Sequence, residues 1–292
     1  MTSLAPTASA LPARKAYHDH IIDVLIAERA PKLSGSPLWP LVRPALYQVL
    51  DYRKARAMAD TIAPLSGRAA LDHISDLLSL QVETYGLDRI PRQGRTILIC
   101  NHPTGIGDGI AVFDALKGVR PDICFYANSD AHRVAPRFDE ILIPVEWVEE
   151  KRTRERTRLT LQLTRQAMEA ERALMIFPAG RIARHGEGGV LADPEWMASA
   201  ISIARKYEAT LMPMHLTGPW SSLFHFFNRF SKELRDITLF HELLNKRGRK
   251  FSLIVGQPVA PEALDADAGV ATLALKAYVE QVLPAHPDRA FA

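Results

Sequence analysis

A histidine and an aspartate lie close together in a glycine-rich stretch that runs from Asn101 to Gly109. The apolar residues 96–100 before it are typical of a buried strand, and residues 110–116 after it are typical of a helix. Glycines let such a turn fold back tightly, so the carboxylate of Asp108 can reach the imidazole of His102. A carboxylate that fixes a histidine's tautomer and stabilises its protonated form makes the pair a general base. Asp108 could also simply cap the helix that follows.

Two further strand-like runs end in residues that could bind a substrate. The first run, residues 173–178, ends with Phe177 and Pro178 and is followed by Ala179-Gly180-Arg181. The second run, residues 209–216, contains Pro213 near its end. Arg181 could make a bidentate contact to a phosphate or a carboxylate, or it could be a surface arginine at a strand end. Open α/β sheets usually bind their ligands at the carboxyl ends of their strands.

These motifs together resemble the glycerolipid acyltransferase family, the group that acylates lysophosphatidic acid and other lysolipids. The family carries a His-x4-Asp motif after a strand, then a Phe-Pro-Glu-Gly motif, then a strand with a Val-Pro-like step. The resemblance covers residues 80–260. Here the spacing is His102-x5-Asp108, and Ala179 replaces the glutamate. Both departures, and the segment 242–248, are similar to a bacterial hemolysin-like and ornithine-lipid-type branch of the family.

The resemblance implies an acyltransferase that moves a fatty acyl group to the hydroxyl of a lysolipid, such as lysophosphatidic acid or a lyso-ornithine-type lipid. The donor would be a thioester of acyl carrier protein or coenzyme A, with no other cofactor. His102 is the expected base and Asp108 its orienting partner. The residues expected to bind substrate are Gly105, Gly107, Arg152, Phe177, Pro178, Gly180 and Arg181. Because Ala179 replaces a glutamate and so removes a carboxylate, we expect this pocket to be more tolerant of anionic head groups.

The sequence disfavours an acyl-enzyme, since it contains no Gly-x-Ser-x-Gly nucleophile motif. We therefore expect direct transfer from the thioester to the hydroxyl. Backbone N–H groups of the glycine turns are candidate donors to the developing oxyanion.

Two other functions remain open at this point. The residues Gly105, Gly107 and Gly109 could form a nucleotide-binding turn, although Asp108 would repel a pyrophosphate at that helix N-terminus. A non-catalytic lipid-binding protein with the same fold would also explain the longer His–Asp spacing and Ala179.

Composition excludes several classes of protein. The chain has 292 residues, 47% apolar and 24% charged, with a net charge of +3, which is typical of a globular protein. Cys100 and Cys124 lie in apolar runs and are expected to be buried rather than paired or metal-bound. We expect no metal site and no nucleic-acid partner.

The basic run 151–158 could form a rim for a lipid head group or for acyl carrier protein, or the solvated first turn of a helix. No apolar run is long enough to span a bilayer. We therefore expect a cytoplasmic protein that associates peripherally with the inner leaflet, through the aromatic segments 37–42 or 220–230.

The expected fold class is α/β, with a mostly parallel sheet flanked by helices and an N-terminal helical extension. Residues 1–15 are expected to be a disordered leader, 16–80 a helical region and 81–292 the acyltransferase domain. Candidate strands are 96–100, 123–127, 141–146, 173–178, 209–216 and 251–256. Candidate helices are 109–117, 154–171, 195–207, 232–245 and 262–282. Two earlier apolar stripes, Leu41 to Leu50 and Leu71 to Tyr85, are also expected to be helical.

Overall fold

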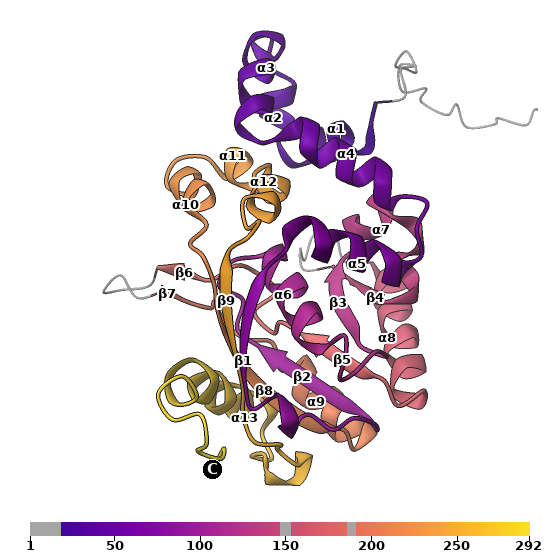
Figure 1. Ribbon diagram of the computed structural model, residues 1–292, viewed down its shortest axis with the longest axis vertical. Coiled ribbons are helices and arrows are strands. Elements are labelled where there is room, and N and C mark those ends of the chain that lie inside the picture. The colour runs from indigo at the N-terminus through magenta and orange to yellow at the C-terminus, as the bar shows by residue number, and fades with distance from the viewer. Residues whose placement is uncertain (1–18, 147–152, 186–190) are drawn as a thin grey trace, which may run out of the picture.

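The protein is described by a computed structural model for residues 19–146, 153–185 and 191–292 (Figure 1). The expected leader, residues 1–15, lies outside the described residues. The helices of the described part are α1 (Ile21–Arg29), α2 (Pro31–Ser34), α3 (Trp39–Val49), α4 (Tyr52–Ile62), α5 (Gly67–Leu78), α6 (Ile106–Leu116), α7 (Asp130–Val134), α8 (Arg154–Glu169), α9 (Ser199–Tyr207), α10 (Ser222–Asn228), α11 (Lys232–Asp236), α12 (Leu239–Leu244) and α13 (Ala268–Ala277). The strands are β1 (Gln81–Tyr85), β2 (Thr96–Cys100), β3 (Cys124–Asn128), β4 (Leu142–Val145), β5 (Ala173–Ile176), β6 (Arg184–His185), β7 (Leu191–Ala192), β8 (Thr210–Thr217) and β9 (Lys250–Val255).

The central sheet has the strand order β1-β9-β8-β2-β5-β3-β4. The five strands from β8 to β4 are parallel to one another, and β9 pairs with β8 in the opposite direction. The carboxyl ends of β2, β5 and β8 therefore meet at one edge of the sheet. The expected mostly parallel α/β fold is confirmed.

Helices cover both faces of the sheet (Figure 1). Leu98 and Cys100 of β2 point into a core shared with α1, α4, α5 and α6, whereas Ile97 and Ile99 point into a core shared with α9 and α13. All five residues of β2 are buried, because a central strand covered on both faces needs a continuous apolar run.

The N-terminal helices pack above the carboxyl edge of the sheet. In Figure 1, α1 to α4 lie at the upper end of the molecule, where α4 contacts α12 and α1 contacts α7. The inner faces of α1 and α4 are buried, including Leu25, Met58 and Ile62. On α3, by contrast, Leu41, Val42 and Val49 are exposed, so most of the first apolar stripe faces away from the core.

Three expected elements differ from the structure. Val82 and Tyr85 were expected on a helix, but Ser79, at φ +45°, ends α5 and residues 81–85 form the edge strand β1. The expected helix 232–245 is divided into α11 and α12. The expected helix 262–282 begins only at Ala268, where the Asp267 side chain accepts the N–H groups of Gly269 and Val270.

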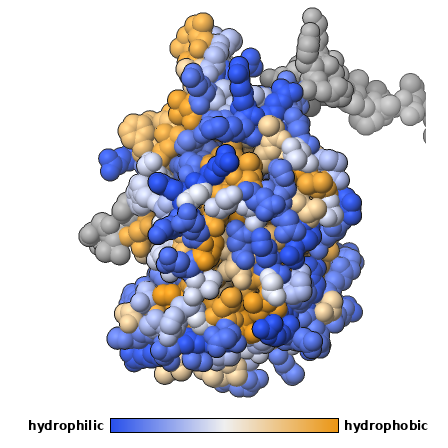
Figure 2. Space-filling view, viewed as in Figure 1, coloured by the Kyte–Doolittle hydropathy of each residue, from blue (hydrophilic) through white to orange (hydrophobic). Residues whose placement is uncertain are grey.

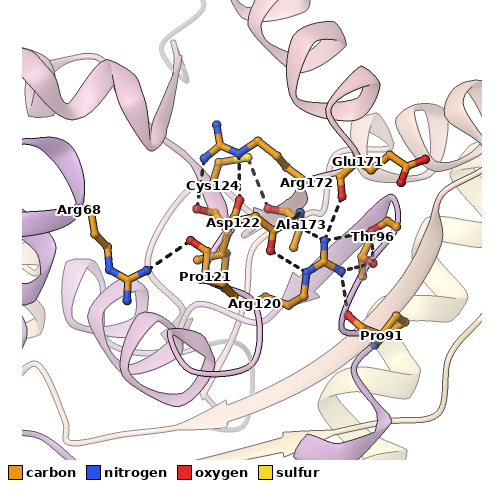
Figure 3. Close-up of polar contacts among 12 residues, drawn as sticks. Arg68, Pro91, Thr96, Arg120, Pro121, Asp122, Cys124, Glu171, Arg172 and Ala173 are labelled. Carbon is orange, nitrogen blue, oxygen red and sulfur yellow. Dashed lines mark hydrogen bonds and ion pairs between the residues drawn. The ribbon is translucent and has the colours of Figure 1, made fainter.

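A buried arginine ties together the edge of the sheet opposite the carboxyl ends (Figure 3). Arg120 is fully buried and pairs with Asp122 at 2.7 Å. It also donates to the Pro91 carbonyl at 2.8 Å and the Thr96 hydroxyl at 3.0 Å, and Asp122 accepts the Ala173 N–H at 3.2 Å. The starts of β2 and β5 are thus joined through one guanidinium group.

The charge of Asp122 depends on this contact. Burial raises the pKa of Asp122, but the hydrogen bond and charge of Arg120 outweigh burial and leave that pKa below its ordinary value. The pair therefore contributes stability above the unfolded pKa of the carboxyl, and that contribution is lost as the pH falls through the folded pKa.

We expect Arg120→Met to lower the free energy of unfolding by about 3–5 kcal/mol, because it leaves a carboxylate and several carbonyls without their donor. Urea denaturation followed by circular dichroism measures the loss. Arg165→Ala, which removes an exposed arginine of α8, should leave the denaturation midpoint unchanged. A loss below about 1 kcal/mol for Arg120→Met would contradict this account of the sheet.

Candidate active site

The first residue after β2 extends the sheet with its side chain. Asn101 is buried, and its amide group donates to the Leu216 carbonyl at 2.9 Å. The Leu216 N–H donates back to Asn101 Oδ1 at 2.7 Å. Asn101 thus continues the pairing of β2 with β8 and fixes the point at which the glycine-rich turn begins.

The turn brings His102 against Asp108. His102 Nδ1 lies 2.9 Å from Asp108 Oδ2. The two atoms are close but not aligned as a hydrogen bond, a common state of catalytic pairs before substrate binds. Gly105, at φ +94°, makes the return possible, and a Cβ there would lie 2.8 Å from Ile182.

Asp108 is fully buried in the first turn of α6. Its carboxylate accepts the N–H groups of Thr104 and Gly105 at 2.9 and 3.0 Å, and the Thr104 hydroxyl at 2.5 Å. The N-terminal end of the helix dipole adds to this stabilisation. Asp108 therefore caps the helix and also contacts His102, so the cap and the contact with the imidazole do not exclude each other.

The same hydrogen bonds count against a nucleotide site. The Asp108 carboxylate occupies the N-terminus of α6 and takes up the N–H groups of Thr104 and Gly105. These are the groups that a phosphate would need at this position.

The His102 ring stacks on Phe177, with ring centroids 4.4 Å apart and an angle of 27° between the planes. Asp108 takes the Nδ1 side of the ring, so Nε2 is the nitrogen available to a hydroxyl group. The ring is mostly buried, with 17% of the side chain exposed. His102 is thus held from two sides by residues of two neighbouring strand ends.

An apolar cavity of about 340 Å³ adjoins His102. Around the histidine it is lined by Gly105, Phe177, Gly180 and Arg181. Apolar side chains from the N-terminal helices and the sheet line the rest, among them Leu25, Met58, Ile62, Leu71, Ile74 and Phe125. The N-terminal helices therefore complete the cavity and do more than cover the sheet.

The other expected binding residues lie in different positions. Gly107 packs under the turn, where a Cβ would lie 3.2 Å from Lys246, and it does not line the cavity. Pro178 is buried beside the cavity, and its carbonyl accepts the Met197 N–H at 3.0 Å. Arg152 lies outside the described residues.

Several residues around His102 carried no signal in the sequence. Arg184 follows Arg181 by three positions, and its Nε is buried without a hydrogen-bond partner among the described residues. Burial, and the positive charges of Arg235 and Arg181, lower the pKa of Arg184. The Arg184 guanidinium is thus close enough to those of Arg181 and Arg235 to feel their charge, and of the three Arg235 is paired with Asp236 at 2.7 Å.

A buried ion pair supports the turn from below. Lys246 and Glu242 are both buried and lie 3.1 Å apart. Lys246 donates to Ser221 Oγ at 3.0 Å, and Ser221 donates to the Thr104 carbonyl at 3.1 Å. Burial raises the pKa of Glu242, but Lys246 and the Phe224 N–H outweigh it and leave the pKa lowered.

Both cysteines are buried and free, as expected. Burial raises the pKa of Cys124 to about 11 and that of Cys100 well above its ordinary value. Neither thiol is suited to act as a nucleophile.

Comparison with known proteins adds independent evidence. The family model described as Acyltransferase matches residues 81–217, which include His102, Asp108 and the Phe177–Arg181 segment. A lyso-glycine lipid O-acyltransferase of Phocaeicola vulgatus is 25% identical over 205 residues, which are 67% of this chain and 70% of the relative. A protein of the same name from Bacteroides thetaiotaomicron is 22% identical over 201 residues, covering 67% and 72% of the two chains.

Among solved structures, the 1-acyl-sn-glycerophosphate acyltransferase PlsC of Thermotoga maritima is similar with a TM-score of 0.49 and 14% identity, covering 90% of this chain and 98% of that one. The family match and the two named relatives agree with the motifs on the strand ends. Residues 81–217 therefore match the acyltransferase family model, and together with the two named relatives this match supports a lipid O-acyltransferase of the glycerolipid acyltransferase type.

Proposed function

We propose that this enzyme transfers a fatty acyl group from an acyl carrier protein or coenzyme A thioester to the hydroxyl of a lysolipid, with His102 as general base. The observation that carries the proposal is the contact of His102 with the buried carboxylate of Asp108 beside an apolar cavity. An apolar cavity of this kind can hold an acyl chain. The adjoining histidine can take the proton of the hydroxyl that attacks the thioester carbonyl.

In the proposed reaction, Nε2 of His102 takes the proton of the acceptor hydroxyl while the oxygen attacks the thioester carbonyl. The tetrahedral intermediate then collapses, and the C–S bond breaks. The departing thiolate takes the proton from the imidazolium, so the base is regenerated. No acyl-enzyme forms on this route.

The oxyanion needs hydrogen-bond donors, and the turn limits the choice. The N–H groups of Thr104 and Gly105 already donate to Asp108. The first N–H groups of a helix have no partner within it, which leaves that of Ile106, a residue at the start of α6 that lines the cavity. We propose that this group, rather than the N–H of Gly105, faces the developing charge.

For the acceptor we propose a lysolipid with an anionic head group held by Arg181 and Arg184. Both are arginines without a carboxylate partner among the described residues, and the unpaired Nε of Arg184 is buried. Position 179 is an alanine, so the carboxylate that acts on Arg184 is that of Asp236, which is paired with Arg235. A carboxylate-bearing head group, as in glycine- or ornithine-type lipids, would fit this pair as a phosphate would.

We also propose that the enzyme works on a membrane surface. No helix of the described residues is long and apolar enough to cross a bilayer. Exposed apolar residues gather at the upper end of the molecule, on α3 and on α10 and its flanks (Figure 2). They are Leu38, Leu41, Val42, Val49, Trp220, Phe226 and Phe230. Partial insertion of such a surface would bring the N-terminal helices and the cavity to the lipid.

We expect His102→Ala to lower acyl transfer about 10²- to 10⁴-fold, because no base remains to take the hydroxyl proton. Asp108→Asn should lower it about 10- to 100-fold, because a buried acceptor and its charge are lost. Mass spectrometry of the lipid product measures both rates. His286→Ala, which replaces an exposed histidine, is the control and should keep the wild-type rate. Wild-type turnover in His102→Ala would contradict the proposed base.

We expect Gly109→Leu to shift acyl-chain preference towards shorter chains. Gly109 lines the cavity, and a Cβ there would meet no atom within 4 Å, so the new side chain would take up cavity space. A competition assay with thioesters of several chain lengths measures the preference. Gly118→Leu follows the same helix and also meets open space, but outside the cavity, so it should leave the preference unchanged. An unchanged preference in Gly109→Leu would argue against this cavity as the acyl site.

We expect Leu41→Glu to weaken binding to vesicles of phosphatidylcholine and phosphatidylglycerol at least about tenfold. The variant lacks the favourable free energy of burying the leucine side chain in the bilayer. Leu41 is 77% exposed, so the fold should be unaffected. Vesicle flotation measures the binding. Leu273→Glu on α13, at the other end of the molecule, is the matched control (Figure 1). Equal binding of the two variants would refute the proposed surface.

A further inference from the structure

Both backbone groups of His102 are bound by the ends of one small hairpin. The Ala183 N–H, just before β6, donates to the His102 carbonyl at 2.9 Å. The His102 N–H donates to the carboxylate of Asp193, just after β7, with distances of 3.0 and 3.1 Å to its two oxygens. Strands β6 and β7 pair with each other and project from the body of the molecule (Figure 1). The hairpin therefore holds the peptide units on both sides of the catalytic ring.

Asp193 is itself fixed by its surroundings. It is 6% exposed, and its carboxylate also accepts the Trp196 indole N–H at 2.9 Å. Its own N–H donates to Glu280 Oε1 at 2.8 Å, and Glu280 pairs with Lys276. A neutral acceptor would satisfy the His102 N–H at lower cost, since a buried carboxylate loses its hydration. The charge at this position therefore calls for a functional reason.

We propose that Asp193 is a positioning residue for acyl transfer. It holds the backbone of His102 so that the ring stays between Phe177 and Asp108, and its negative charge stabilises the imidazolium as it forms. The inference rests on the proposed function, in which His102 is the base. To the two residues of the His102–Asp108 motif it adds Asp193, which lies 91 positions after His102 in the chain.

The electrostatics around Asp193 agree with this role. Burial raises the pKa of Asp193 to about 6; the His102 N–H, the Trp196 N–H and the charge of His102 lower it, and Glu280 raises it. The other titratable groups nearby are Asp108 and the Cys100 thiol on the side of the turn, and Lys276 and His215 beside Glu280. Below pH 6 Asp193 would thus be neutral and would support His102 less well.

Stability and activity should then respond to acid in opposite directions. Because the folded pKa of Asp193 lies above its ordinary value of 3.8, its contribution to stability is fully present below that value and is lost as the pH rises through about 6. Acid loss of activity through Asp193 is therefore not loss of the fold. Thermal denaturation at each pH separates the two effects.

The test compares the wild-type chain with Asp193→Asn and Glu280→Gln in the acyl-transfer assay. At pH 8, Asp193→Asn should lower kcat about 10- to 100-fold with little change in KM, because the acceptor is neutral at every pH. In a plot of kcat against pH, the fall in kcat at acid pH should reflect two protonations in the wild-type chain and one in Asp193→Asn. Glu280→Gln should keep the wild-type kcat at pH 8, and its acid limb should move to lower pH because a negative neighbour of Asp193 is gone.

The indole N–H of Trp196, which donates to the same carboxylate, provides a readout that needs no turnover. In ¹H–¹⁵N spectra of the full chain its signal should shift as the pH falls through about 6, and this shift should be absent in Asp193→Asn. If the wild-type protein acylates no lysolipid, the proposed function fails, while the indole titration still tests the ionisation of Asp193. An active wild type with the same kcat and pH profile in Asp193→Asn would overturn the inference. Should that variant not fold, an unshifted acid limb in Glu280→Gln would overturn it equally.

Discussion

The structure depends above all on one buried carboxylate at the start of α6. The Asp108 carboxylate holds the turn closed, because three donors of Thr104 and Gly105 point at its oxygens. The same carboxylate lies 2.9 Å from His102, so local folding and the proposed chemistry share one group. Gly105 makes the geometry possible, since an L-residue at φ +94° would be strained and would collide with Ile182. A turn built in this way cannot relax without separating the histidine from the aspartate.

The rest of the fold holds this turn from several sides. Asn101 joins it to β8, the Lys246–Glu242 pair supports it through Ser221, and the β6–β7 hairpin binds the backbone of His102. At the opposite edge of the sheet, Arg120 joins the starts of β2 and β5. The N-terminal helices add the apolar wall of the cavity and carry an exposed apolar surface beyond it. The strand ends thus hold the groups that are proposed to react, and the helices above them carry the surface that is proposed to meet the lipid.

The sequence predicted the parts of this arrangement that are local. The strands β2, β5 and β8 are buried on both faces, so each is visible as a continuous apolar run. The edge strand β1 was predicted as a helix, because the helical spacing of apolar residues in α5 continues through Val82 and Tyr85. An edge strand in which only Val82 is partly buried shows no alternating apolar pattern to oppose that prediction. His102 and Asp108 were found because one turn contains both. Asp193 and Arg184 were not, because single charged residues far along the chain show no pattern until folding brings them to the turn.

The central claim is direct transfer from a thioester to a lysolipid hydroxyl at His102. The measurement that tests it most directly is a single-turnover incubation of the wild-type chain with acyl carrier protein and coenzyme A thioesters and a panel of lysolipids, followed by mass spectrometry of both lipid and protein. The account predicts an acylated lipid, formed best from an acceptor with an anionic head group, and a protein of unchanged mass. An acylated protein, or no acylated lipid from any donor and acceptor, would contradict it.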